Sequence, residues 1–149
     1  ETIPRVFKVP RWDGKPFRNK VLLIHGEQGL GDQIQFARFV AHAAALGGRI
    51  LLEVRRPLFG VMRALGLPED RVRLVEQGLE LPAFDLEVSL ISLPAVLKVA
   101  AGDLGRTVPY LKAEPERIRR WRGRVDRNRL SVGLIWQGNP KAKADKGRS

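Results

Sequence analysis

The sequence predicts an α/β protein with a doubly wound, mainly parallel sheet, because short apolar runs alternate with segments of helical spacing. Five runs of four or five residues are almost continuously apolar, as in strands that are covered on both faces. They occupy residues 21–24, 50–54, 72–75, 86–90 and 132–136. A parallel sheet brings the carboxyl ends of its strands to one edge, where ligands bind in this class of fold.

Four segments between these runs have the spacing of helices. They cover residues 32–46, 57–65, 94–101 and 115–125. The first is the clearest, because Gly47 and Gly48 follow it as a stop signal. The last carries Ile118, Trp121 and Val125 on one stripe, which we expect to be buried.

The chain divides by composition into three parts. Residues 1–19 are rich in proline and charge and predict an extended lead-in, while residues 20–140 hold all the predicted strands and helices. Residues 141–149 form a polar tail directly after the last predicted strand and turn. We therefore expect a single α/β domain that is one piece of a longer protein.

Length and composition narrow the classes of protein. The 149 residues suffice for one domain with a sizeable core, and 44% of them are hydrophobic. The absence of cysteine excludes disulfides and thiolate metal sites, and two histidines are too few for a histidine-rich metal site. No apolar run reaches the roughly 18 residues that a membrane span needs. We expect a cytoplasmic location, either free or peripheral at the inner face of the membrane.

The chain is strongly basic, with 27 Lys and Arg against 16 Asp and Glu and a net charge of +11. This balance favours an anionic partner, which can be nucleic acid, a phosphorylated small molecule or an acidic lipid headgroup. Seven arginines between residues 117 and 129 form a basic run. Because Trp121 is predicted to be buried and not exposed beside these arginines, the sequence does not favour nucleic acid.

The segment GEQGLGDQIQ, residues 26–35, lies between the first predicted strand and the first predicted helix. Gly29 and Gly31 are predicted to allow positive φ and a close approach of the backbone. Asp32 is predicted to be the helix N-cap, with Gln35 completing a capping box. Glu27 and Gln28 add two polar side chains at the ligand edge of the sheet, which a helix cap alone does not explain.

A dinucleotide-binding turn is the obvious alternative for this segment. Its G-x-G-x-x-G pattern requires a third glycine that is missing here, and Asp32 would repel a pyrophosphate at the helix start. Glu53, at the end of the second predicted strand, imitates the ribose-binding acid of that pattern. His25 is either a polar strand end or a site residue, and His42 is a packing or surface residue.

A second polar turn follows the fifth predicted strand and contains Gln137 and Asn139. It reads either as an ordinary strand-terminating turn or as a second wall of the cleft beside residues 26–31.

Four blocks of the sequence resemble a known family. HGEQGLGDQIQFARFV, FDLEVSLISLPAVL, VPYLKAEPERIRRWRGRV and VGLIWQGNP, the last followed by a spaced Asp and Arg-Ser, look like the glycosyltransferase-like domain that follows tetratricopeptide repeats in many bacterial proteins. That domain is similar to the lipopolysaccharide heptosyltransferases, a glycosyltransferase family 9-like group with the GT-B architecture. The resemblance covers residues 12–149 and implies two Rossmann-like domains that face each other across a cleft.

The resemblance implies that this chain is the N-terminal, acceptor-side domain, inactive alone. A missing C-terminal domain would bind the nucleotide-sugar donor, so no cofactor is expected in this part. Gly31-Asp32 matches the Gly-Asp whose carboxylate is the proposed general base, which takes the proton of an acceptor hydroxyl as the glycosidic bond forms. The scheme needs no metal, because helix dipoles and basic residues of the donor domain stabilise the departing diphosphate. The sugar or other hydroxyl acceptor would be held by Glu27, Gln28, Gly29, Gly31, Gln35, Gln137 and Asn139.

The chain departs from the family pattern near its end. Ala142 and Ala144 stand where the repeat-linked family usually has a histidine and an asparagine, although Asp145, Arg148 and Ser149 remain. These departures favour an alternative hypothesis, in which the domain is a non-catalytic binding or scaffold module attached to upstream repeats that recruit protein partners. A nucleic-acid binder that depends on the charge of +11 is a third hypothesis.

Overall fold

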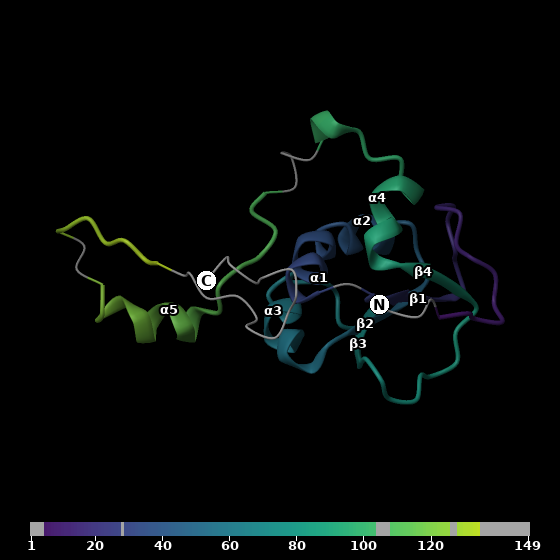
Figure 1. The fold of residues 1–149 in the computed structure, drawn as a ribbon, viewed down its shortest axis with the longest axis horizontal. Helices are drawn as coiled ribbons and strands as arrows, with labels where there is room; N and C mark the ends of the chain where they lie inside the picture. The colour runs from purple at the N-terminus through teal and green to yellow at the C-terminus, as the bar shows by residue number, and fades with distance from the viewer. Residues whose placement is uncertain (1–4, 28, 104–107, 126–127, 135–149) are drawn as a thin grey trace, which may run out of the picture. The chain divides into compact units, whose positions relative to one another are not determined.

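The structure is a computed structural model, and it describes residues 5–27, 29–103, 108–125 and 128–134. The chain forms two compact units, Glu1–Lys112 and Ala113–Ser149. The first unit contains the sheet and most of the helices, and the described residues of the second contain one helix (Figure 1).

A four-stranded sheet forms the centre of the first unit. Its strands are β1 (Val21–His25), β2 (Arg49–Val54), β3 (Val72–Glu76) and β4 (Leu86–Ser89). They lie in the order β3-β2-β1-β4, and every pair is parallel. The predicted α/β class with a parallel, Rossmann-like sheet is therefore confirmed, and the first four strands match the predicted apolar runs to within one residue at each end.

The observed helices are shorter than the segments for which the apolar spacing predicted helices. They are α1 (Leu30–Ala37), α2 (Val40–Ala45), η1 (Arg56–Leu58), α3 (Phe59–Arg63), η2 (Leu90–Ser92), α4 (Leu93–Val96) and α5 (Pro115–Arg122). A single helix over residues 32–46 is wrong, because the chain tightens between α1 and α2. There the amide of Phe39 donates to the carbonyl of Phe36 at 3.1 Å, and the Phe39 side chain enters the core. Gly47 and Gly48 end α2 with positive φ, as predicted.

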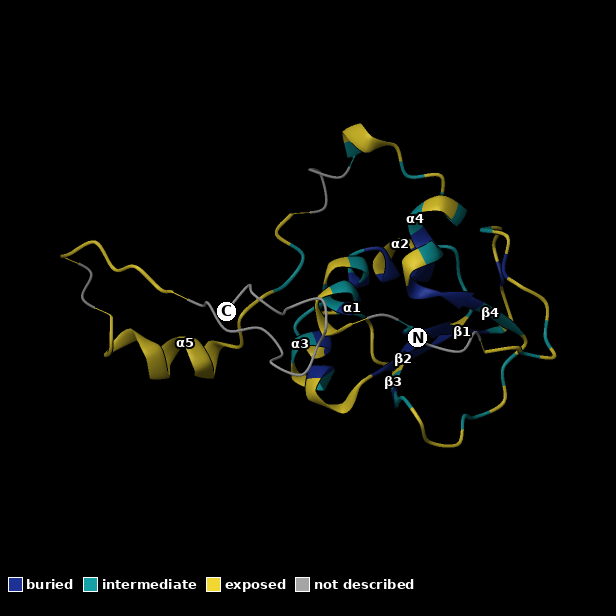
Figure 2. Ribbon diagram, in the orientation of Figure 1, coloured by how far each residue is buried: buried dark blue, intermediate teal, exposed yellow. Residues whose placement is uncertain are grey.

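The two faces of the sheet are covered differently (Figure 2). Alternate residues such as Leu22 and Ile24 pack on the helices in the main core, whereas Leu23 faces the opposite side. On that side, the sheet is covered by Phe7 of the lead-in and by Leu81 and Phe84. None of the described residues that cover this side belongs to a helix. The second face is therefore closed by irregular segments.

The lead-in is part of the fold. Trp12 and Phe17 are each 2% exposed and belong to the main core, with their rings edge to face at 5.4 Å. The amide of Trp12 donates to the carbonyl of Glu87 at 2.8 Å, and the amide of Glu87 donates to the carbonyl of Pro10 at 3.1 Å. The segment thus forms a short parallel bridge on β4, and its two aromatic rings anchor it.

The second unit corrects two predictions. Residues 131–134 form no strand, and Val132 and Leu134 are exposed, so the fifth predicted strand is absent where the structure describes it. The predicted stripe is also exposed, at 43% for Ile118 and 57% for Trp121 on α5 and at 46% for Val125, which lies beyond the end of α5. Arg124 lies 5.3 Å from the centre of the Trp121 ring. The prediction that Trp121 is buried, which was the argument against nucleic-acid binding, is therefore wrong.

Candidate functional site

The candidate site begins at the turn from β1 into α1, at the carboxyl edge of the sheet. Gly29 is the N-cap of α1, with an extended backbone at φ −61° and ψ 172°. Asp32 is the third residue of the helix, and its Oδ2 accepts a hydrogen bond from the amide of Gly29 at 3.1 Å. The prediction that Asp32 is the N-cap in a capping box with Gln35 is wrong, because the N-cap is Gly29, three residues earlier. Asp32 still satisfies a backbone donor of the first turn.

The glycines of this turn have other roles than predicted. Neither Gly29 nor Gly31 has positive φ, and Gly31 lies inside α1 with open space beside it. The close approach occurs at Gly26, where a Cβ atom would lie 2.8 Å from Cδ of Gln33. Gln33 is 1% exposed, and its Oε1 accepts the amide of Arg55 at 3.2 Å. The local sequence pattern did not single out this buried glutamine, since its partners come from β2 and the β1 turn.

A small pocket lies beside Asp32. It is lined by Glu27, Asp32, Gln33, Phe36, Leu90 and Ile91, so it brings together the β1 turn, α1 and η2, which follows β4. Its volume of about 10 Å³ is close to the least that holds one water molecule. Oδ2 of Asp32 accepts the hydrogen bond from Gly29, and Oδ1 has no hydrogen-bond partner among the described residues. Oδ1 can therefore accept a hydrogen bond from a ligand. The pocket can hold a water or a single hydroxyl, and a sugar ring does not fit in it.

A polar network borders this pocket on the second face of the sheet. His25 is 3% exposed, and its Nε2 lies 2.9 Å from Oε2 of Glu87. Its Nδ1 lies 3.5 Å from Oε1 of Glu27, which is longer than a hydrogen bond. The hydroxyl of Ser89 donates to Oε2 of Glu27 at 2.6 Å. His25, which the sequence left between two interpretations, is thus held between two carboxylates.

Glu53 is fully buried, at 0% exposure, and faces the same side as His25. Arg5 of the lead-in pairs with it, with Nη1 2.5 Å from Oε2. The carboxylate is therefore buried and already paired with Arg5, so it is not available to a ribose hydroxyl. Glu53 resembles a ribose-binding acid only by its position in the sequence.

We expect Arg5→Ala to lower the free energy of unfolding by about 1–2 kcal/mol, because it leaves the buried Glu53 carboxylate without its cation. The loss stays moderate because the Arg5 side chain is 38% exposed, so water can reach the space that it leaves. Urea denaturation of Arg5→Ala, Glu53→Gln and the double variant measures the coupling of the pair. If the losses of the two single variants simply add in the double variant, the two side chains do not stabilise each other, and the ion pair makes no contribution to stability.

The structure brings only part of the predicted site together. Glu27 and Asp32 line the same pocket, whereas Gln35 is exposed on α1 and does not line it. The other predicted contacts, Gln28, Gln137 and Asn139, lie outside the described residues. In the described part of the chain, no group of three or more acidic, histidine or cysteine side chains is placed to hold a metal ion. No helix among those residues is long and apolar enough to cross a membrane.

The sheet order, the parallel strands and the polar turn into α1 define an α/β, Rossmann-like domain. The chain is similar to Protein FlbA of Caulobacter vibrioides, with 28% identity over 162 aligned positions. The match covers 95% of this chain and 27% of FlbA, so the chain spans about a quarter of the length of that relative. No family model matches the chain, and no solved structure matches it.

Proposed function

We propose that this chain is the acceptor-side domain of a GT-B type glycosyltransferase, in which a sugar passes from a nucleotide-sugar donor to a hydroxyl acceptor. The donor domain would be a second Rossmann-like unit elsewhere in the same protein. FlbA extends well beyond the region that matches this chain, which leaves room in that protein for such a unit. The resemblance of the sequence blocks at residues 25–40 and 84–97 to the repeat-linked glycosyltransferase-like domain supports the same assignment.

The observation that carries the proposal is the position of Asp32. Its carboxylate lies at the carboxyl edge of a parallel sheet, where ligands bind in this fold class. One oxygen accepts the amide of Gly29, which orients the group, and the other has no hydrogen-bond partner among the described residues. The adjoining pocket has room for one hydroxyl or water. A carboxylate held in this way can accept the proton of an acceptor hydroxyl while the remainder of the acceptor lies outside the pocket.

Glu27 is the second residue that we assign to the acceptor. It lines the pocket with Asp32, and its own carboxylate is fixed by the hydroxyl of Ser89 at 2.6 Å. In this role it would position the acceptor, while Asp32 would take the proton. The two carboxylates therefore have different roles because their surroundings differ.

The decisive test is Asp32→Asn in a protein that contains both domains. We expect transfer from the nucleotide sugar to fall by at least about 100-fold, the usual effect of losing a general base. The fold should be unchanged, because the amide oxygen of asparagine can still accept the Gly29 hydrogen bond. Release of the nucleoside diphosphate from UDP-, ADP- and GDP-sugars, with water or added sugars as acceptors, measures the loss.

Asp70→Asn is the matched control, since it makes the same change at an exposed aspartate just before β3, at the other end of the strands. It should leave transfer within about twofold, as expected for a surface substitution away from the site. Equal transfer by the Asp32→Asn variant and the unaltered protein would contradict the assignment of Asp32. Circular dichroism and a melting curve of each variant separate lost chemistry from lost folding.

A non-catalytic binding or scaffold domain is the second candidate function. It is favoured by the small volume of the pocket and by the use of Glu27 in bonds within the fold. For that function, neither the unaltered two-domain protein nor its Asp32→Asn variant should release a nucleoside diphosphate from any of the three donors. A pull-down with this domain as the bait would then identify what the module binds.

A further inference from the structure

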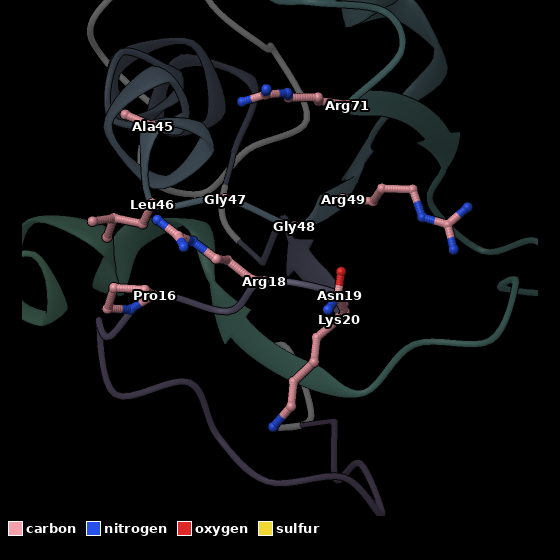
Figure 3. Close-up of a pocket in the computed structure, with 10 residues that line it drawn as sticks. All are labelled: Pro16, Arg18, Asn19, Lys20, Ala45, Leu46, Gly47, Gly48, Arg49 and Arg71. Carbon is pink, nitrogen blue, oxygen red and sulfur yellow. The ribbon is translucent and has the colours of Figure 1, made fainter.

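A second hollow of about 830 Å³ opens at the amino-terminal edge of the sheet (Figure 3). Its walls are the turn at residues 16–20, the end of α2 with Gly47 and Gly48, and the residues that begin or precede β2 and β3. Because all four strands are parallel, this edge lies opposite the turn that carries Asp32. The hollow is therefore separate from the candidate acceptor site.

The lining of this hollow carries charge of one sign. Arg18, Lys20, Arg49 and Arg71 line it, and no acidic side chain of the described residues does. All four are exposed, and none of them makes an ion pair with any residue that the structure describes. Cations gathered in a concave surface raise the local potential and attract anions. The arrangement has no structural counter-ion among the described residues, so a bound anion would relieve the repulsion among these groups.

Acidic groups nearby do not neutralise the cluster. Glu69 and Asp70 line a neighbouring hollow that shares Arg49 and Arg71, but no ion pair within the described part of the chain joins them to those arginines. The end of α2 contributes the partial negative charge of a helix C-terminus, about half an elementary charge for a full helix. Four full positive charges exceed that contribution, so the net field of the hollow is positive.

The backbone of the hollow is held by contacts in the core. Gly48 has φ +75°, and its backbone lies so close to Phe17 that a Cβ atom would be 2.4 Å from the ring. The amide of Arg49 donates to the carbonyl of Lys20 at 2.9 Å, and the amide of Lys20 donates to the carbonyl of Phe17 at 3.1 Å. Phe17 itself is buried. The two walls are therefore fixed to each other before a ligand arrives, which lowers the entropic cost of binding.

Figure 3 distinguishes two pairs among the cations. The guanidinium groups of Arg18 and Arg71 are turned toward the end of α2 at Ala45 and Leu46, whereas Lys20 and Arg49 extend away from it. Arginine presents a planar set of donors that matches phosphate oxygens, so Arg18 and Arg71 can contact the same anion. Lys20 and Arg49 add positive potential at the rim.

We propose that this hollow binds a compound with several phosphate charges, held by Arg18 and Arg71 and attracted by Lys20 and Arg49. Its volume lies within the range of small-molecule sites, roughly 300–1,000 Å³. The lining contains no aromatic side chain on which a base could stack, so the phosphates are what it recognises. The same chemistry occurs in a soluble di- or triphosphate and in a phosphorylated lipid headgroup, and the two sources are separated by experiment.

Titration calorimetry of the full chain with inorganic tripolyphosphate at low salt tests the proposal. We expect binding that weakens as salt is added, because exposed ionic contacts are screened. The double variant Arg18→Gln and Arg71→Gln should bind at least about tenfold more weakly, since it removes both charge-assisted contacts. Lys20→Gln with Arg49→Gln should weaken binding by a smaller factor, and it tests the same hollow if the first double variant fails to fold.

The matched control is Arg120→Gln with Arg122→Gln, which removes the same charge from exposed positions of α5. It should stay within about twofold of the unaltered chain, because none of the residues that line the hollow is altered. An equal loss in both double variants, or no binding of tripolyphosphate by the unaltered chain, would overturn a specific site for a soluble phosphate compound.

Vesicles separate the two sources of phosphate. The first probe is phosphatidylcholine vesicles that contain phosphatidylinositol bisphosphate, whose headgroup carries several phosphate charges. Cosedimentation with these vesicles, but not with pure phosphatidylcholine vesicles, that is lost in the Arg18 and Arg71 variant would assign the hollow to a lipid headgroup. Vesicle binding that survives in that variant would exclude the headgroup. The result is independent of the proposed glycosyl transfer, because Asp32 lies at the opposite edge of the sheet and is unaltered in every variant.

Discussion

Replacing Trp12 with alanine is expected to lower the free energy of unfolding by about 4 kcal/mol, within the range for removing a large aromatic side chain from a core. The side chain is 2% exposed and packs edge to face on Phe17 at 5.4 Å. Its indole N–H also donates to the carbonyl of Lys15 at 2.8 Å, which closes the turn between the two rings. Urea denaturation followed by circular dichroism measures the loss, and the midpoint should fall without a change in slope.

Trp121→Ala is the matched control, because it removes the same side chain from a position that is 57% exposed. Its effect should be within about 0.5 kcal/mol, as for most surface substitutions. Similar losses at the two tryptophans would contradict the different roles of the lead-in and α5. A large loss at Trp121 alone would mean that the α5 stripe is covered by another surface in solution.

Replacing Gly48 with alanine is expected to cost about 3 kcal/mol of stability, because two penalties act together. The residue has φ +75°, a conformation that costs an L-residue with a Cβ about 1–2 kcal/mol. The new methyl group would also meet Phe17, 2.4 Å from the ring and 2.5 Å from the carbonyl oxygen. Overpacking of this kind costs typically about 1–3 kcal/mol, and the buried ring has little room to move.

Gly66→Ala isolates the backbone part of that penalty. Gly66 has φ +62°, but nothing lies within 4 Å of the Cβ position. Its loss should therefore be about 1 kcal/mol, the conformational cost alone. Thermal melts of both variants give the comparison, and equal losses would show that the contact between Gly48 and Phe17 is not tight.

The sheet was predictable because its signal is local and strong. Each of the first four apolar runs became a parallel strand, and burial on both faces is the physical reason that such runs are almost continuously apolar. The fifth run has the same composition, yet residues 131–134 form no strand. A strand needs a neighbour for its hydrogen bonds, and composition alone does not show whether one is present.

The candidate site was predictable in part. The polar segment 26–35 does follow β1 at the carboxyl edge, and Glu27 and Asp32 do share a pocket. The start of the helix was not predictable, since Gly29 and Asp32 both suit an N-cap and the extended backbone at Gly29 decides between them. Gln33 and the pairing of His25 with Glu87 were missed as well, because each joins residues that are far apart along the chain.

The sequence by itself determined the α/β class, the first four strands, the end of α2 at Gly47 and the excess of positive charge, because each depends on neighbouring residues or on totals. Only the tertiary structure decided where Trp12 is buried, where the helix breaks at Phe39 and which cations gather around the hollow. Arg18 and Arg71 stand far apart in the sequence and meet there because parallel strands begin at the same edge of the sheet. Periodicity along the chain contains no information about such meetings, since they depend on the order of the strands and on the packing between them.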